Sequence, residues 1–244
     1  MRCSLDGTLI TMTSVQGARA RARIEVTAAI KDEARRQLAA EGAAKLSLRA
    51  VARELGMVSS ALYRYFPSRD DLLTALIVDA YDSVGADAEA ALAASRGADA
   101  PARWVAVCRA VRAWALAHPH EYALIYGSPV PGYSAPRDTV GPASRVGLTF
   151  ITIAQDAHRR GSVALPPLAD ELRPEAARLA DEFAPDLPPA LVVALVAAWS
   201  QLFGMVSFEV FGQFNRMVEN RDAFFTAAVR RLAHDTGLIV RPAP

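Results

Sequence analysis

The chain has 244 residues, of which 27 are Lys or Arg and 26 are Asp or Glu, so its formal net charge is +1. Its two cysteines, Cys3 and Cys108, are too few for a disulfide framework, and this scarcity is typical of a reducing cytoplasm. The composition is rich in alanine, which favours helices. The sequence lacks the alternation of Val, Ile and Thr that strands show, so we predict an all-α chain.

The first 20 residues lack helical periodicity and contain two glycines with several Ser and Thr residues, which predicts a disordered N-terminal arm. No apolar stretch of the kind found in a secretory signal peptide occurs in them. Arg19, Arg21 and Arg23 have two interpretations. They form either a basic arm that contacts DNA or a solvated terminus, and the second is the commoner.

Two short helices over residues 48–55 and 59–65, joined by a tight turn at Gly56, form the most informative pattern of the chain. Only glycine adopts the left-handed backbone of such a turn at little cost. A preceding helix over residues 22–41 would cover the back of this pair. The arrangement is either an ordinary helical hairpin or a helix-turn-helix, whose second helix enters the major groove of DNA. The apolar residues at helical spacing are Ile30, Ala34, Leu38, Leu48, Val51, Ala52, Leu55, Ala61, Leu62 and Phe66.

Charge is distributed unevenly along the chain. Residues 1–70 contain 12 Lys and Arg against 7 Asp and Glu, a net of +5, whereas residues 71–244 carry a net of −4. Phosphate backbones attract such a basic segment whatever the base sequence, and an acidic remainder discourages DNA from coating the rest of the molecule. The charge pattern therefore favours a DNA-binding helix-turn-helix.

A Ser-x-x-Asp capping box at residues 68–71 begins the next predicted helix, which covers residues 69–94 and would tie the basic segment to the rest of the chain. The segment 127–142 is too rich in Pro and Gly for a helix or a strand and predicts a loop. The other long periodic segments after Gly97 are helical. They cover residues 101–118, 119–127, 140–161, 168–183, 188–215 and 219–235.

Residues 190–214 are apolar nearly all round the predicted helix, which indicates a helix buried on more than one side. A transmembrane span is one interpretation, because about 20 apolar residues suffice to cross a bilayer. Ser200, Gln201 and Glu209 interrupt the segment, however, and nothing else in the chain resembles a membrane protein. We therefore expect no membrane partner, and a helix that packs against its own body on one side and a second subunit on the other.

No pattern of catalytic or cofactor-binding residues stands out, so we expect no enzyme activity, no cofactor and no metal ion. His118 and His120 lie on either side of a proline, which disfavours a helical metal-binding pair, and His158 and His234 add no ligand spacing. A nucleophile pair of Cys108 with a histidine is conceivable, but a buried structural cysteine is far commoner. Nucleophile elbows, phosphate-binding loops and dinucleotide fingerprints are missing from the sequence.

Residues 47–73, SLRAVARELGMVSSALYRYFPSRDDLL, closely resemble the DNA-binding segment of the TetR family of bacterial transcriptional regulators. The resemblance extends over residues 24–80. A looser resemblance, at the Ala-His-Pro-x-x-Tyr motif of residues 117–122 and the loop that follows, is to the ligand domain of an actinobacterial branch of that family.

The resemblance implies three parts: the disordered arm at residues 1–20, a three-helix helix-turn-helix DNA-binding domain at residues 21–68, and a helical ligand-binding and dimerisation domain at residues 69–244. It implies a cytoplasmic regulator that binds a double-stranded DNA operator as a homodimer through residues 188–235. Members of the family usually repress transcription. The resemblance also implies an unknown, mostly apolar small-molecule effector that would release this protein from DNA.

The resemblance also assigns DNA contacts to seven residues. Arg49 could contact a guanine through two hydrogen bonds, or could simply face solvent. Residues two apart on a helix point about 200° apart, so one of Tyr63 and Tyr65 would face DNA, and Tyr63 matches a phosphate-contacting tyrosine of the family. Val58 stands where the family usually has a capping serine, so Ser59 would take over capping or phosphate contact. The set is Ser47, which would cap the first hairpin helix, Arg49, Ser59, Ser60, Tyr63, Tyr65, and Arg69, which would clamp a phosphate.

The effector site would be lined by large apolar side chains, most of which also suit an ordinary core. The resemblance implies a cavity between the helices of the C-terminal domain for a small, mostly apolar molecule. Arg112, Glu121 and Gln201 could orient it. The candidate ligand-binding residues are Trp104, Tyr122, Tyr126, Phe150, Trp199, Gln201 and Phe203.

Two other functions remain open on the sequence alone. One is an all-α enzyme or small-molecule carrier in which the basic hairpin is incidental. The other is an architectural or partner-binding protein that uses the hairpin without base specificity. A gel shift at two salt concentrations separates both from a sequence-specific regulator, because non-specific binding falls steeply with salt.

Overall fold

The computed structural model describes residues 7–239, and for residues 7–16 it describes the backbone alone. Within this range the regular structure is helical, apart from one antiparallel bridge between Val163 and Leu238. The chain divides into two compact units. The first, which we call the head, is Met1–Leu76 with Pro129–Ser134, and the second, the body, is Ile77–Ser128 with Ala135–Pro244. The predicted all-α fold is confirmed.

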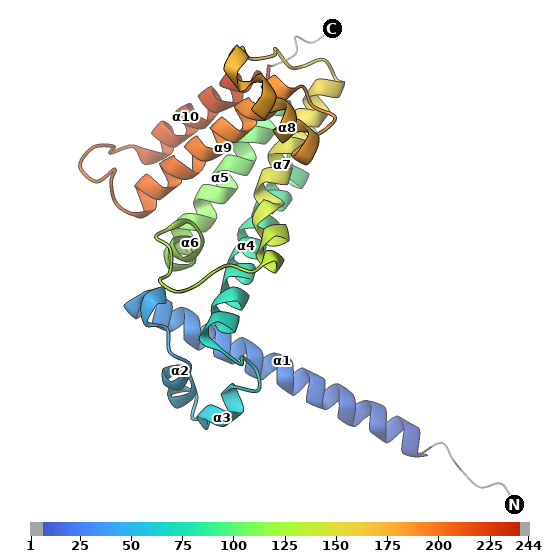
Figure 1. Cartoon of the computed structure of the whole chain (residues 1–244), viewed down its shortest axis with the longest axis vertical. Helices are drawn as coiled ribbons and strands as arrows, with labels where there is room; N and C mark the ends of the chain where they lie inside the picture. Colours follow the sequence, from blue (N-terminus) through green and yellow to red (C-terminus); the bar gives the residue numbers. More distant parts are fainter. Residues whose placement is uncertain (1–6, 240–244) are drawn as a thin grey trace, which may run out of the picture. The chain divides into compact units, whose positions relative to one another are not determined.

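The head contains the first helices of the chain, drawn from blue to cyan in Figure 1. The predicted boundary at residue 68 lies before the observed one, because the head extends to Leu76, inside the helix that begins at Arg69. The elements of the head are α1 (Gly7–Glu41), the 3-10 turn η1 (Ala43–Lys45), α2 (Leu48–Glu54), α3 (Ser59–Leu62) and the first part of α4 (Arg69–Ala94).

Helix α1 begins at Gly7, so the disorder predicted for residues 1–20 is wrong for residues 7–20, and residues 1–6 lie outside the described range. The physical reason is that helix formation is cooperative. Once the amphipathic segment that follows has formed its first turns, each further residue adds one hydrogen bond. No proline interrupts residues 7–20, so the helix continues towards the N-terminus.

The core of the head is built from the apolar positions that the sequence predicts. Ile30 and Ala34 of α1 are fully buried, as are Val51 of α2 and Leu62 of α3. The loop segment Pro129–Ser134 also belongs to this unit, where the hydroxyl of Tyr133 lies 2.9 Å from that of Thr74 on α4. The head is therefore assembled from two separate stretches of the sequence.

The turn between α2 and α3 is a Schellman motif. Gly56 adopts φ = 65°, its N–H bonds to the carbonyl of Arg53 at 3.1 Å, and the N–H of Met57 bonds to the carbonyl of Ala52 at 2.8 Å. Both bonds satisfy carbonyls at the end of α2. The predicted glycine turn is confirmed.

Helix α3 is shorter than the predicted 59–65, because it ends at Leu62 and the chain continues in tight turns. The N–H groups of Arg64 and Tyr65 bond three residues back, to the carbonyls of Ala61 at 3.3 Å and Leu62 at 2.8 Å, so turns replace the α-helical bonding pattern. Pro67 keeps the residue before it out of a helical conformation. The N-cap is Val58, without a side-chain hydrogen bond, so the predicted capping by Ser59 is wrong. Ser59 is already the first helical residue and lies beyond the capping position.

The body contains the remaining helices, close to their predicted bounds. The predicted loop 127–142 has a 3-10 turn near its end and is otherwise irregular up to Val140. The elements are the rest of α4, α5 (Ala100–Ala117), α6 (Pro119–Tyr126), η2 (Arg137–Thr139), α7 (Val140–Arg159), η3 (Asp170–Leu172), α8 (Arg173–Phe183), α9 (Pro189–Val210) and α10 (Arg221–Asp235).

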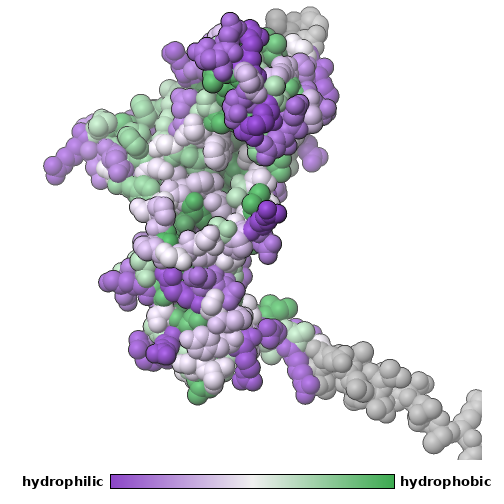
Figure 2. All heavy atoms as spheres, in the orientation of Figure 1, coloured by the Kyte–Doolittle hydropathy of each residue, from purple (hydrophilic) through white to green (hydrophobic). Residues whose placement is uncertain are grey.

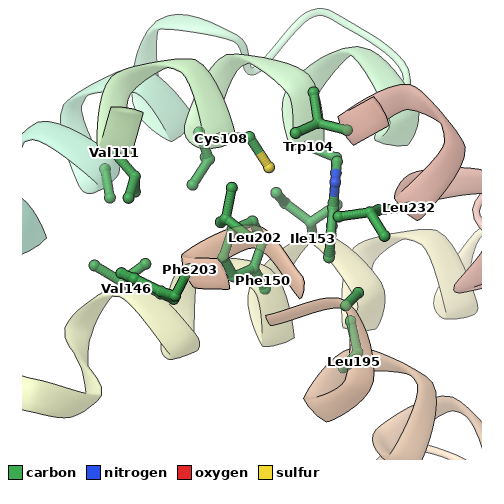
Figure 3. Close-up of a cluster of buried hydrophobic side chains, with 14 of the residues drawn as sticks. Trp104, Cys108, Val111, Val146, Phe150, Ile153, Leu195, Leu202, Phe203 and Leu232 are labelled. Carbon is green, nitrogen blue, oxygen red and sulfur yellow. The ribbon is translucent and has the colours of Figure 1, made fainter. Parts of the chain in front are cut away.

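Helix α5 lies at the centre of the body, packed against α7, α9 and α10. Figure 3 shows the apolar side chains that meet there from these helices. Trp104 of α5 is fully buried, and its ring lies 4.4 Å from that of Phe150 on α7. Leu202 of α9 is also fully buried. These contacts make a single dense core that holds the body together.

Candidate DNA-binding surface, effector site and dimer surface

The N-terminus of α2 carries the first two residues assigned to DNA. The hydroxyl of Ser47 accepts a hydrogen bond from the N–H of Ala50 at 3.4 Å, so the predicted capping of α2 is confirmed. Arg49 is exposed in the first turn of the same helix. Among the described residues, no carboxylate pairs with its guanidinium, which leaves the full positive charge available for a phosphate or a base.

Helix α3 presents short polar side chains and one tyrosine to solvent. Ser59 and Ser60 are exposed in its first turn, and the ring of Tyr63 is 41% exposed just after its last residue. Val58, at the N-cap, is 70% exposed although it is apolar. The N-terminus of a recognition helix is the part that reaches base edges, so these residues form a surface suited to the major groove.

Tyr65 differs from Tyr63 in its surroundings. It is half-buried, and the guanidinium carbon of Arg23 lies over its ring at 5.1 Å from the ring centroid. The two tyrosines therefore have different environments, and the DNA contact assigned to them stays a prediction. Sequence analysis missed the pairing with Arg23, because it joins residues from distant parts of the chain.

Arg69 has contacts that the sequence does not reveal. Its Nη2 donates to the carbonyls of Ala43 and Ala44 at 2.8 and 3.3 Å, and its Nε donates to the carbonyl of Leu46 at 3.2 Å. Its Nη1 lies 3.6 Å from a carboxylate oxygen of Asp70. The side chain thus fastens the start of α4 to the segment between α1 and α2, and the phosphate contact assigned to it stays a prediction.

Four of the candidate effector residues form a chain of ring contacts in the body. Tyr126 lies 5.2 Å from Tyr122 and 4.2 Å from Phe203, and Phe203 lies 5.5 Å from Trp199, between ring centroids. Tyr81, which sequence analysis did not select, adds an edge-on contact to Tyr126 at 5.9 Å. We call these five residues the aromatic cluster. Trp199 is 40% exposed, so the cluster reaches the surface.

Hydrogen bonding and burial set the chemistry of the two central tyrosines. The hydroxyl of Tyr122 donates to the carbonyl of Phe203 at 3.1 Å and lies 2.8 Å from that of Ser207. Burial raises the pKa of Tyr122 to about 12, and burial together with the neighbouring Tyr81 and Tyr122 raises the pKa of Tyr126 further. Both rings are therefore neutral at physiological pH and suit an apolar ligand.

The other candidate effector residues lie elsewhere. Trp104 and Phe150 belong to the central core, where the indole N–H of Trp104 is buried without an acceptor among the described residues. The amide of Gln201 is exposed and donates to the carbonyl of Ala197 in its own helix. Arg112 is committed to an ion pair with Glu209, at 2.7 and 2.8 Å, which leaves it poorly placed to orient a ligand.

Helix α9 is apolar on two sides. Its inner side is buried in the body core, whereas Val196, Trp199 and Phe208 are 40–51% exposed on the outside. Figure 2 shows apolar surface over α10 and towards the loop that precedes it. By length and composition α9 would also be long enough to cross a membrane, and 39% of its most apolar window is buried.

Two family models match the sequence. The model described as bacterial regulatory proteins, tetR family, matches residues 30–76, which contain α2, α3 and most of the head core. The model described as tetracyclin repressor-like, C-terminal domain, matches residues 104–232, which is more than half of the chain. The chain belongs to the tetR family of bacterial regulatory proteins.

Individual relatives agree with this assignment. The HTH-type transcriptional regulator Rv1816 of Mycobacterium tuberculosis is 42% identical over 228 residues, which cover 88% of this chain and 94% of the relative. The crystal structure of protein SCO4313 has a TM-score of 0.71 and 37% identity, and the match covers 88% of this chain and 98% of that one. The regulator PfmR of Thermus thermophilus, at 18% identity and a TM-score of 0.55, shares the fold. This tetR-family protein is a DNA-binding transcriptional regulator, which argues against α9 as a membrane span.

Proposed function

We propose that this regulator is a cytoplasmic repressor that binds a near-palindromic operator as a homodimer and leaves it when a small, mostly apolar effector binds. The observation that carries the proposal is the surface of α2 and α3. There Arg49, Ser60 and Tyr63 are exposed, and their side chains have no partner among the described residues. Polar groups left free in this way are available for base edges and phosphates.

Selection of bound DNA from a random pool, followed by titration of matched and scrambled duplexes at two salt concentrations, tests DNA recognition. Tyr63→Ala is expected to weaken binding to every sequence and to reduce its salt dependence, because it loses a phosphate contact. Arg49→Ala is expected to relax base preference at one position of each half-site. A pool without a common sequence would favour the architectural function, and no binding at either salt concentration would favour the enzyme or carrier.

The outer side of α9, together with α10, is the surface we assign to the homodimer. Dimerisation is typical of the family, and α9 combines exposed Val196 and Phe208 with the small residues Ser200 and Gly204 at intervals of four residues on its exposed side. Small residues let two helices approach closely, and exposed aromatic side chains supply buried area once they meet a partner. A dimer also provides the two recognition helices that a palindromic operator requires.

The effector site that we propose is the aromatic cluster. It combines apolar ring faces with the Tyr126 hydroxyl, for which the described residues provide no hydrogen-bond partner. Sites for small ligands usually combine apolar surface with few polar groups. An effector that prefers one conformation of the body shifts the population towards it. A coupling of about 2 to 3 kcal/mol would weaken operator binding by roughly 30- to 150-fold. Helix α4 belongs to both units and is the natural element to carry the change.

Intrinsic fluorescence tests this site, because Trp199 is part of the cluster whereas Trp104 and Trp114 are buried. Titration with a panel of small phenolic and aromatic compounds is expected to quench the wild-type protein, and the Trp199→Phe variant should lose most of that signal. The same compound must lower operator affinity. A compound that binds at the cluster but leaves operator affinity unchanged would overturn the proposed mechanism.

A further inference from the structure

The head contains an open recess of about 360 Å³ beside the recognition helix. We call it the Arg23 recess. It lies between α1 and the α2–α3 hairpin, so it is a second feature of the head next to the surface already described. Its lining residues are Arg23, Val26, Met57, Ala61, Arg64 and Tyr65.

Two arginines give the recess its charge. Arg23 and Arg64 are both exposed, and neither pairs with a carboxylate of the described residues. Two uncompensated guanidinium groups at one recess favour an anion, because each offers paired N–H donors that match the oxygen atoms of a phosphate.

Arg23 is held in place before any ligand binds. Its guanidinium carbon lies 5.1 Å from the ring centroid of Tyr65, and its Nη2 donates to the carbonyl of Arg64 at 3.4 Å. Stacking on one face and a hydrogen bond at one edge leave the other N–H groups free. Such preorganisation lowers the conformational entropy that an arginine loses on binding.

The rest of the recess is apolar, which indicates more than a simple anion site. Val26, Met57 and Ala61 are half-buried and line it beside the ring face of Tyr65. Apolar atoms next to two cations match a sugar attached to a phosphate. Because Ala61 belongs to α3, a recognition helix in the major groove would bring the bordering DNA strand to this place.

We propose that the Arg23 recess binds one sugar–phosphate unit of the operator backbone, with Arg23 and Arg64 on the phosphate and the apolar residues against the deoxyribose. The proposal rests on the proposed binding of a specific operator. It assigns to Arg23 a contact that fixes the register of α3 in the groove, since phosphate contacts position a protein on DNA whereas base contacts specify the sequence.

The test compares Arg23→Ala with Arg21→Ala, an equal loss of charge two residues away on the exposed part of α1. Each neutralised phosphate contributes about 0.9 to the slope of log affinity against log salt concentration. One such contact therefore contributes about eightfold to the affinity at 0.1 M salt relative to 1 M salt. Because each subunit of the proposed homodimer carries this arginine, Arg23→Ala removes two such contacts, and it is expected to lower affinity by roughly 60-fold and the slope by about 1.8. Arg21→Ala should change both quantities much less.

Operators with a neutral methylphosphonate at the same backbone position of both half-sites, moved in turn along the backbone, locate the phosphate. One position should weaken the wild-type protein as Arg23→Ala does, and at that position the variant should lose much less than the wild type, because only the Arg64 contact remains to be lost. Tyr65→Leu, which removes the ring beneath the Arg23 guanidinium, should resemble Arg23→Ala.

Three outcomes would overturn the proposal. One is equal affinities of the Arg23→Ala and Arg21→Ala variants, and another is additive losses at every methylphosphonate position. The third is a lower melting temperature of Arg23→Ala with an unchanged salt slope, which would make the Arg23–Tyr65 pair a structural fastening of α1. All three outcomes require that the wild-type protein binds the selected operator. If the wild-type protein does not bind it, the operator proposal fails, and that result is distinct from a failure of the Arg23 recess.

Discussion

Val58 is an unusual residue at the scale of single side chains, because it is apolar, 70% exposed and placed at the N-cap of α3. We expect it to contact the methyl group of a thymine, the apolar feature of the major groove. Replacing that thymine by uracil should weaken wild-type binding about fourfold, since burial of one methyl group is worth about 0.8 kcal/mol.

The Val58→Ser variant should no longer distinguish thymine from uracil at that position. Serine is a good N-cap residue, so any loss of affinity would not come from a weaker α3. Uracil outside the recognised half-site serves as the control. Equal discrimination by both proteins would remove Val58 from the base contacts.

Arg69 has a structural role that its sequence context hides. Replacing Arg69 by Ala leaves the carbonyls of Ala43, Ala44 and Leu46 without this donor, and hydrogen bonds that involve a charged group contribute about 1.5 to 3 kcal/mol. We expect Arg69→Ala to lower the free energy of unfolding by about 2 kcal/mol, measured by urea unfolding. Arg49→Ala, at an exposed and unpaired arginine, is the control. Unchanged stability with a reduced salt slope of DNA binding would instead favour the phosphate clamp.

At the scale of whole elements, local capping signals predict individual helix ends, whereas ends without such a signal are missed. The capping box that predicts the start of α4 is confirmed, with the hydroxyl of Ser68 donating to the carboxylate of Asp71 at 2.7 Å and accepting from its N–H at 3.1 Å. The early start of α1 and the shortness of α3 were not predicted. Both depend on competition between neighbouring segments, which side-chain periodicity alone does not contain.

An ion pair connects three helices of the body. Arg112 of α5 makes a two-point contact with Glu209 of α9, and its Nη1 donates to Asp222 of α10 at 3.0 Å. The bond to Glu209 raises the pKa of Arg112, so this arginine stays charged. The side chains of Arg112 and Glu209 are 13% and 5% exposed, which places the pair largely out of water.

Removal of one partner should therefore leave a poorly solvated charge. We expect Glu209→Ala to lower the free energy of unfolding by about 3 kcal/mol or more, measured by urea unfolding. The control is Glu175→Ala, which breaks the exposed pair with Arg178 and should change stability little. Similar losses in the two variants would show that the Arg112–Glu209 pair contributes no more than a surface pair.

At the scale of the whole molecule, the sequence predicts the order and class of the helices but not all of the effector site. Tyr122, Tyr126, Trp199 and Phe203 were selected as large apolar side chains and do meet in one cluster. Trp104 and Phe150 were selected on the same criterion and lie in the core. Size and hydropathy cannot separate these cases, because both environments favour the same side chains.

The oligomeric state gives a prediction at this scale. Phe208→Asp places a charge on the outer side of α9, where Phe208 is 51% exposed, and should convert the proposed dimer to a monomer in sedimentation experiments. Operator affinity should fall with it, because two half-sites are no longer bound together. Val140→Asp, at a residue 64% exposed on α7, is the matched control. A Phe208→Asp protein that stays dimeric would place the interface elsewhere.

The chain leaves the head at Leu76, returns for Pro129–Ser134 and leaves again, and Tyr133 meets Thr74 on that return. Exchange of domains between relatives at one crossover point near residue 76 would therefore transfer an incomplete unit. A functional hybrid regulator needs a second graft at the returning loop, or a partner loop that already supplies a hydroxyl opposite Thr74. The two units of this protein are therefore interleaved along the sequence, and neither can be exchanged as one continuous segment.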